Sequence, residues 1–335
     1  MQKDFILRQE PKLSITSVAD FLGISAQGVH HQLKSKNIDL PRIGNKGYIN
    51  HTIAKNLFNI KFDKKIIVGQ IVKGGTGKTT TIDYLSSCVN SFGAKVLLID
   101  ADPQGNLTDL FNIDADKHAT LIDVVKNESS LKNAIISINP GLDLIPSRIE
   151  NVVLDTTIIN DRMSVDLFYR NLLEEVQDHY DFIFIDCPPT LGLAVTAASL
   201  FADVIIVPLN PDKFSSKGLE ILRQELKLLQ RNFKKNINFK VYLNKFSSKT
   251  ILSDKTVMRL LSDHNLSPHV LSTTIQFSQE IPNLSSENKN AFLQLKKSII
   301  RDDFCLLTQE LLGFTKNDVT TLKQQKSNLE IPATA

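Results

Sequence analysis

The segment IVKGGTGKTT, residues 71–80, has the residue types and spacing that bind a chain of phosphate groups. Its three glycines let the backbone turn its N–H groups onto phosphate oxygens, and a helix that begins after them adds a favourable dipole. Lys78 is placed to reach the β- and γ-phosphates of a nucleotide, and the Thr79 hydroxyl is placed to bind Mg²⁺. A tight glycine turn without a ligand is the alternative interpretation.

The residues on either side provide the strand–loop–helix context that a phosphate-binding loop requires. Residues 65–72 are apolar and β-branched, which predicts a buried strand that leads into the glycines. After the loop, Ile82, Leu85 and Val89 recur at helical spacing, and Gly93 follows as a stop. This context favours a phosphate-binding loop over a bare turn.

The loop departs from the common G-x-x-x-x-G-K-S/T pattern at its start, because Val72 stands where the first glycine would fall and Lys73 follows it. The string KGGTGKTT resembles the deviant Walker A motif of the ParA/MinD family of ATPases. In that family the early lysine crosses a dimer interface and contacts phosphates held by the other subunit, and the resemblance implies this role for Lys73. It also implies nucleotide contacts for Lys73, Gly74, Gly75, Thr76, Gly77, Lys78, Thr79, Thr80, Pro211 and Asn244.

Acidic residues end two further predicted strands. The first strand runs into LLIDADPQGN, which resembles the switch I segment of the family. By that resemblance Asp102 positions the attacking water, and Asp100 supports the water shell of the metal. The strand YDFIFID resembles a Walker B strand, so Asp186 is expected to hold Mg²⁺ through water, together with Thr79. The alternative is that these carboxylates only cap strand ends. The residues assigned to catalysis are Lys73, Lys78 and Asp102.

Two later segments resemble the part of the family site that holds the base. Residues 202–209 form an apolar strand, and the following PDKFSSKG, which begins at Pro211, resembles the loop found there in the family. The strand that begins at Phe239 ends in Asn244, where the family has an asparagine that contacts adenine. An asparagine that only forms a turn is the alternative for this position.

Strands alternate with helical stretches from about residue 65 to residue 313. This alternation predicts an α/β fold with a doubly wound, mostly parallel sheet of the P-loop NTPase type. We expect three parts along the chain. They are an N-terminal helix–turn–helix region at 1–64, the ATPase domain at 65–314, and a polar tail at 315–335.

The N-terminal region is basic and carries a helix–turn–helix pattern. The chain has a net charge of +3, and residues 1–65 contain eleven Lys and Arg against five Asp and Glu. Apolar residues flank Gly23 at spacings typical of two helices joined by a turn, and a basic hairpin follows. A helical hairpin that serves only packing is the alternative. The residues expected to face DNA are Gln27, His31 and Lys34 on the second helix, and Arg42 and Lys46 in the hairpin.

The whole chain resembles a ParA-type partitioning ATPase with an N-terminal DNA-binding region. The resemblance implies ATP and Mg²⁺ as cofactors, an ATP-dependent homodimer that binds DNA without sequence preference, and slow hydrolysis stimulated by a ParB-like centromere-binding protein. It also implies that the N-terminal region represses its own operator. Relatives often use an arginine near position 276 for nonspecific DNA, and Gln276 stands there in this chain, so other cations must serve, with Lys255 and Arg259 among the candidates.

Two other functions remain open from the sequence. One is a transcriptional regulator that uses ATP as a switch and has no partition role. The other is a MinD-like positioning ATPase, which is disfavoured because the tail lacks a basic amphipathic helix that would anchor it to a membrane. Three widely spaced cysteines fit a reducing compartment, so we expect a cytoplasmic, nucleoid-associated protein without a membrane partner.

Overall fold

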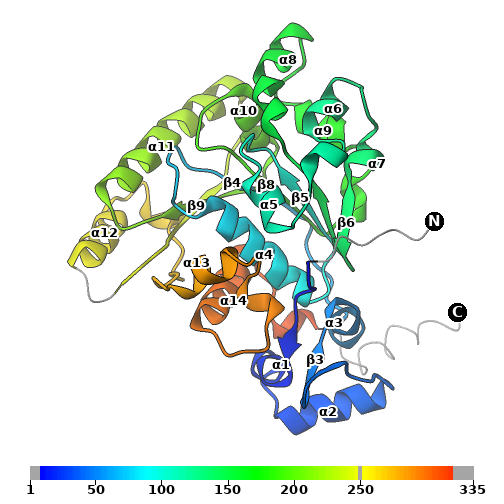
Figure 1. Ribbon diagram of the computed structural model, residues 1–335. Helices are drawn as coiled ribbons and strands as arrows, with labels where there is room; N and C mark the ends of the chain where they lie inside the picture. The colour runs from blue at the N-terminus through cyan, green and yellow to red at the C-terminus, as the bar shows by residue number, and fades with distance from the viewer. Residues whose placement is uncertain (1–7, 248–250, 320–335) are drawn as a thin grey trace, which may run out of the picture.

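The computed structural model describes residues 8–247 and 251–319. A central seven-stranded sheet with helices on both faces forms the body, and the N-terminal residues form a smaller unit beside it (Figure 1). The predicted doubly wound, mostly parallel sheet is confirmed. Of the predicted tail, residues 320–335 lie outside the described residues. No helix in the described part of the chain is long and apolar enough to cross a membrane.

The strands of the central sheet follow the order β10-β9-β4-β8-β5-β7-β6. All neighbours are parallel except β6 and β7, which form an antiparallel hairpin at one edge. The inner strands are apolar on both sides, as expected for a parallel sheet that is covered on both faces. The strands are β4 (Lys65–Gly69), β5 (Val96–Asp100), β6 (Ile136–Asn139), β7 (Leu142–Ile145), β8 (Phe182–Asp186), β9 (Val204–Leu209) and β10 (Phe239–Leu243).

Two hydrophobic clusters cover the two faces of this sheet. Helices α4 and α14 pack on one face, together with the N-terminal unit, and α8, α9, α10 and α11 pack on the other. The helices of the body are α4 (Lys78–Ser91), α5 (Asn106–Leu110), α6 (Leu121–Val125), α7 (Leu131–Ala134), α8 (Leu154–Asn160), α9 (Phe168–Leu173), α10 (Leu193–Phe201), α11 (Lys213–Phe233), α12 (Ile251–Ser262), α13 (Glu280–Ser285) and α14 (Ile299–Leu312). Short 3-10 turns lie at Ala115–Lys117, Ile149–Val153, Gln177–His179, Ser267–His269, Ala291–Leu293 and Lys316–Asp318.

The N-terminal unit contains the two helices and the hairpin that the sequence predicts. Ser14 and Ser25 cap the two helices, each accepting a hydrogen bond from the backbone of the first turn, and Gly23 ends the first helix in a left-handed conformation. The sheet order β1-β3-β2 is antiparallel. The elements are β1 (Leu13–Ser14), α1 (Ile15–Leu22), α2 (Ala26–Ser35), β2 (Arg42–Ile43), β3 (Lys46–Ile49) and α3 (His51–Phe58).

The N-terminal unit shares one hydrophobic core with the body. The ring of Phe92, at the end of α4, lies 4.6 Å from that of Phe21 and 5.6 Å from that of Phe58, both in the N-terminal unit. Gly93 allows the close approach, because a Cβ there would lie 2.6 Å from the Cα of Lys55 on α3. The apolar residues of the N-terminal unit between Leu13 and Phe58 therefore depend on the body for part of their burial.

A buried ion pair also joins the two units. Arg8 Nη1 lies 2.5 Å from Asp83 Oδ1, and the two side chains are 2% and 3% exposed. Asn290 donates a further hydrogen bond to the same carboxylate at 2.9 Å. Charges removed from water in this way are tolerated only while each keeps its partner.

We predict that Asp83→Ala lowers the free energy of unfolding by about 3–5 kcal/mol, because it leaves the Arg8 guanidinium buried without a counter-charge. Urea denaturation followed by circular dichroism measures this loss. Asp178→Ala is the matched control, because Asp178 pairs with Lys64 at side-chain exposures of 88% and 55%. Such an exposed pair contributes little, so the control should keep nearly the wild-type midpoint. Equal midpoints for the two variants would contradict the structural role of the Arg8–Asp83 pair.

Candidate nucleotide-binding site

The register of the parallel strands brings the predicted site residues to one edge of the sheet. Gly69 at the end of β4 pairs with Asp186 at the end of β8, and Asp100 at the end of β5 pairs with Asp186 from the other side. Ligands of open α/β sheets bind at the carboxyl ends of the strands. The glycine loop therefore opens onto the same edge as both acidic strand ends.

The glycine loop leaves the sheet earlier than the sequence predicts, because β4 ends at Gly69 and residues 70–77 form the loop. A Cβ added at Gly74 or Gly75 would meet no atom within 4 Å, so the loop borders open space there. Gly77 has a φ of 96°, and a Cβ on it would lie 2.5 Å from the amide nitrogen of Asn244. The loop thus forms a cradle with room for a ligand on one side and a tight contact on the other.

Asn244 and two neighbours hold the loop from the side of β9 and β10. The Asn244 amide donates to the Thr76 carbonyl at 2.7 Å, and the Lys245 ammonium donates to the Gly75 carbonyl at 3.0 Å. The Asn210 amide reaches the same carbonyl at 3.5 Å, and its Oδ1 is buried without a hydrogen-bond partner among the described residues. Sequence reasoning missed Asn210 and Lys245, although each directly adjoins a predicted site residue, Pro211 or Asn244.

Lys78, Thr79 and Asp186 form the centre of the site. The Lys78 side chain lies at the start of α4 and is 7% exposed. Burial lowers the pKa of Lys78, while the carboxylates of Asp186 and Asp102 act to raise it. The Thr79 hydroxyl donates to Asp186 Oδ2 at 2.6 Å. A cationic side chain is thereby buried beside carboxylates, with no hydrogen bond from its ammonium to another described residue.

The same residues fit a magnesium ion. Asp186 Oδ1 is buried and accepts no hydrogen bond in the described part of the chain. Burial raises the pKa of Asp186 to about 7, and hydrogen bonding from Thr79 and the charge of Lys78 oppose that shift. One carboxylate and one hydroxyl match the sparse protein ligation of Mg²⁺, which keeps waters and substrate phosphates as its other ligands. Within the described ranges, no group of three His, Cys, Asp or Glu side chains forms a metal cage.

Asp100 organises the loop that carries Asp102. Its carboxylate accepts hydrogen bonds from the backbone of Asp102 at 3.2 Å and of Thr108 at 2.9 Å, and from the Thr108 hydroxyl at 2.7 Å. Burial raises the pKa of Asp100 to about 8, and the charge of Asp186 adds to the effect. These contacts make Asp100 a positioning residue, and its predicted part in the metal's water shell stays a prediction.

Asp102 is 6% exposed and lies close enough to Lys78 and Asp186 to influence their pKa values. Its Oδ1 accepts a hydrogen bond from the Gln104 backbone at 3.0 Å, and Ser147 donates to its carbonyl at 2.7 Å. The carboxylate is therefore held in place near Lys78 and Asp186, and its part in positioning the attacking water stays a prediction.

Lys73 contacts its own chain in this structure. Its ammonium lies 3.1 and 3.2 Å from the two carboxylate oxygens of Asp212, which caps the N-terminus of α11, and 3.4 Å from the Ser215 hydroxyl. Burial acts to raise the pKa of Asp212, but hydrogen bonds from Ser215 and the charge of Lys73 outweigh it, so the pKa lies below its ordinary value. Both partners are about one-third exposed, so the pair contributes about 1 kcal/mol or less.

The residues predicted to contact DNA lie away from the cradle and in two places. Gln27, His31 and Lys34 are exposed on α2, and Arg42 and Lys46 are exposed in the hairpin. The other two, Lys255 and Arg259, are exposed on α12, on the far side of the body from α2 (Figure 1). The structure therefore separates two groups of cations, and their contact with DNA stays a prediction.

The fold and the cradle define a P-loop nucleotide-binding ATPase. Residues 64–239, more than half of the chain, match a family model described as an AAA domain. The sporulation initiation inhibitor protein Soj of Bacillus subtilis is 34% identical over 170 residues, which span 50% of this chain and 67% of Soj. The chromosome partitioning protein ParA of Caulobacter vibrioides is 33% identical over 192 residues, which span 55% of this chain and 70% of that protein.

A solved structure shares the fold. The Cyanothece McdA–ATP complex superposes with a TM-score of 0.67 at 22% identity, covering 78% of this chain and 99% of that one. The chain belongs to the ParA/MinD family of partitioning ATPases. It is an ATPase, and its cofactors are ATP and Mg²⁺.

We predict that alanine substitutions of Lys73 and Lys78 change the affinity for ATP to different extents. Lys78→Ala should weaken ATP binding on the order of 100-fold, because it removes a desolvated charge contact to the phosphates of the same chain. Lys73→Ala should keep ATP binding within a few fold, because this ammonium lies on Asp212 and outside its own cradle. Titration with a fluorescent ATP analogue in Mg²⁺ measures both affinities.

Lys245→Ala is the control for loss of a lysine beside the loop, because among the described residues its ammonium bonds only the backbone carbonyl of Gly75. Its affinity for the analogue should fall less than that of Lys78→Ala. An equal loss of affinity for Lys73→Ala and Lys78→Ala would contradict the separate roles of the two lysines.

Proposed function

We propose that this protein is a DNA-segregation ATPase whose ATP-bound form is a homodimer that binds DNA without sequence preference. In this proposal hydrolysis is slow, and a ParB-like centromere-binding protein stimulates it. The observation that carries the proposal is the position of Lys73, which lies next to the cradle but bonds to Asp212 instead of pointing its charge into its own site. The names of the relatives, chromosome-partitioning and sporulation proteins, support the same process.

The cradle residues divide the work of nucleotide binding. Backbone N–H groups of residues 74–79 and the Lys78 ammonium bind the phosphates, while Asn244 and the segment at Pro211 border the base. Thr79 and Asp186 hold the metal, which when bound neutralises charge on the β- and γ-phosphates. Asp102 orients a water for attack on the γ-phosphate. Nearly all of the catalytic effect in such sites comes from positioning and charge stabilisation.

Lys73 is suited to bridge two chains. Its ion pair with Asp212 is about one-third exposed and weak, so a more concentrated negative charge displaces it readily. The triphosphate of a second chain supplies such a charge, and a lysine contributed by the partner then makes ATP part of the interface. This accounts for a dimer that forms with ATP and dissociates after hydrolysis.

DNA contact in this proposal uses both groups of exposed cations. Lys255 and Arg259 on α12 serve nonspecific binding to phosphates. On α2, Val29 and Leu33 are buried against the body of the N-terminal unit, which leaves Gln27, His31 and Lys34 free to read an operator in a major groove. The hairpin with Arg42 and Lys46 contacts the DNA backbone beside that groove. By binding this operator the protein represses its own expression. It acts in the cytoplasm, at the nucleoid.

A transcriptional regulator switched by ATP is the second candidate. It is favoured by the shared core, because α4 begins after the glycine loop and is capped at its other end by Phe92, which packs against Phe21 and Phe58 of the N-terminal unit. A change at the cradle can thus reach the DNA-reading unit through one helix. ATP-dependent doubling of mass in light scattering, together with ATP-dependent binding to an arbitrary 40-base-pair duplex, supports segregation. Operator binding without either property supports the regulator.

We predict that Asp102→Ala binds ATP and Mg²⁺ but hydrolyses ATP about 100-fold more slowly, because it removes the group that orients the water. The variant should accumulate as a dimer on DNA when ATP is present. Steady-state phosphate release and gel filtration measure these two effects.

Asp109→Ala is the matched control, because Asp109 is an exposed carboxylate on the next helix, α5. It should keep the wild-type rate. Phosphate release by Asp102→Ala at the rate of this control would exclude Asp102 from the mechanism.

A further inference from the structure

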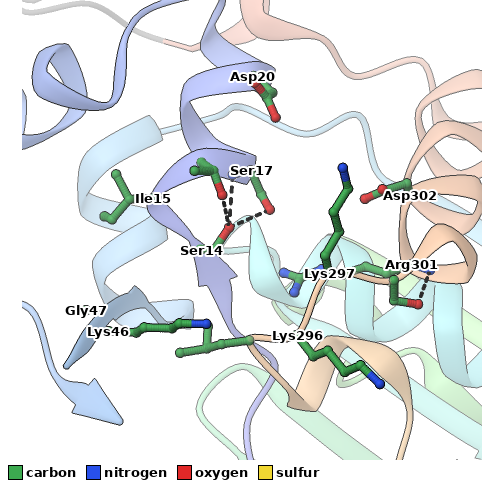
Figure 2. Close-up of a pocket in the computed structure, with 13 residues that line it drawn as sticks. Ser14, Ile15, Ser17, Asp20, Lys46, Gly47, Lys296, Lys297, Arg301 and Asp302 are labelled. Atoms are coloured by element: carbon green, nitrogen blue, oxygen red, sulfur yellow. Dashed lines mark hydrogen bonds between the residues drawn. The ribbon is translucent and has the colours of Figure 1, made fainter. Parts of the chain in front are cut away.

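A cleft of about 600 Å³ lies where the N-terminal unit meets the body (Figure 2). One wall is formed by the first turn of α1 and the start of β3, and the other by the segment that leads into α14. Three lysines line it: Lys46 from β3, and Lys296 and Lys297 from the segment before α14. The elements that form one of its walls, α1 and β3, lie beside α2 and away from α12 (Figure 1).

The positive charge of this cleft is only partly balanced. All three lysines are exposed, and within the described ranges none of their ammonium groups forms an ion pair or hydrogen bond with another residue. Arg301 also lines the cleft and is 5% exposed. Among the described residues its side chain donates hydrogen bonds to the backbone carbonyls of Lys12 and Gln294, and its guanidinium lies 5.3 Å from the centre of the Phe292 ring. Against these four cations the cleft has two carboxylates, Asp20 and Asp302.

Hydroxyl groups and helix ends complete the lining. Ser14, Thr16 and Ser17 lie in or next to the first turn of α1, and their hydroxyls form a connected group with oxygen separations of 2.8 Å. Ser298, which caps α14, lies on the other wall. Hydroxyls and lysines are the side chains that contact phosphate oxygens in DNA complexes, where they fix the register of the protein on the duplex.

We propose that this cleft binds the phosphate backbone of a DNA duplex, so that the ATPase body completes the DNA-binding surface of the N-terminal unit through Lys296 and Lys297. The inference rests on the proposed function, because it takes α1 and α2 as the helices that dock on DNA. In that docking mode the first helix crosses the backbone while the second lies in the major groove. The start of α1 and Lys46 of the hairpin adjoin the same strand of phosphates, and the two body lysines face them across the cleft.

This arrangement extends DNA contact beyond residues 1–64. The sequence gives no reason to connect Lys296 and Lys297 with Lys46, because about 250 residues separate them. It also places bound DNA against α14, whose Phe304 ring packs 4.4 Å from the Tyr84 ring on α4. DNA on this surface therefore contacts a helix that packs directly on the helix of the glycine loop.

The test uses the full-length protein carrying Lys296→Gln and Lys297→Gln together. The control carries Lys126→Gln and Lys132→Gln, two exposed lysines, one at the end of α6 and one on α7, whose loss changes the net charge by the same amount. Duplex affinity is measured by fluorescence anisotropy at several salt concentrations, for operator and scrambled sequences. Thermal unfolding and basal ATP turnover of both double variants should equal those of the wild type.

Each phosphate contact contributes about 0.9 to the slope of log K against log salt concentration. The Lys296/Lys297 variant should therefore lose about 1.8 from the steepness of that slope and bind operator and scrambled duplex on the order of tenfold more weakly at 0.1 M salt. Adding Lys46→Gln should remove about 0.9 more, because it acts on the same strand from the other wall. The control should keep the wild-type slope.

Three outcomes overturn the proposal, and they are distinguishable. A wild-type slope in the Lys296/Lys297 variant, with normal DNA binding by the wild type, removes the cleft from the DNA surface and leaves the proposed function intact. If the wild-type protein binds neither duplex, both the cleft proposal and the proposed DNA-segregation function are wrong. If poly-L-glutamate binds the wild type more tightly than duplex at equal charge, and only the cleft variant loses this binding, the cleft takes an acidic polypeptide instead.

Discussion

The structure depends on unbalanced charge buried at the carboxyl end of one parallel sheet. Lys78, Asp102 and Asp186 are each less than one-tenth exposed, and one oxygen of Asp186 has no hydrogen-bond partner among the described residues. Burying such groups costs free energy unless a counter-charge or a hydrogen-bond partner offsets the loss of water. A triphosphate with Mg²⁺ supplies both the negative charge that Lys78 requires and the cation that Asp186 requires. Binding of the nucleotide and the metal at this edge therefore stabilises the folded chain.

The same constraint explains the two lysines of the loop. Lys78 supplies the buried ammonium of the cradle, and burial lowers its pKa. Lys73 remains at the rim, where Asp212 and Ser215 hold it with a contact that solvent screens. A second cation at the rim stabilises the complex only when the phosphate groups of another chain's nucleotide lie within its reach. The difference in burial between Lys78, which is 7% exposed, and Lys73, whose side chain is 29% exposed, thus links nucleotide binding to association.

Much of this could be predicted from the sequence, because the loop, the strand-end acids and the helix after the glycines are local patterns. The central strands, α4, and the two helices around Gly23 were predictable from periodicity and turn residues. The hairpin of β6 and β7 was not, since its strands are only four residues each and lie at the sheet edge. Contacts between distant segments could not be predicted from the sequence either, because they depend on tertiary packing. Examples are the contacts of Lys73 with Asp212 and of Arg8 with Asp83, and the position of Lys46 opposite Lys296. The core that the N-terminal unit shares with the body at Phe92 was not predictable either, because the predicted domain boundary at residue 64 separates its residues.

The central claim is that Lys73 acts on the nucleotide of another chain, and a mixture of two inactive variants tests it most directly. Lys73→Ala chains keep the cradle but lack the bridging lysine, and Lys78→Ala chains keep the bridging lysine but lack a working cradle. Light scattering with ATP and Mg²⁺ should show each variant alone as a monomer and an equimolar mixture as a heterodimer with one complete site. A Lys73→Ala protein that dimerises alone as the wild type does, or a mixture that stays monomeric, would contradict the claim.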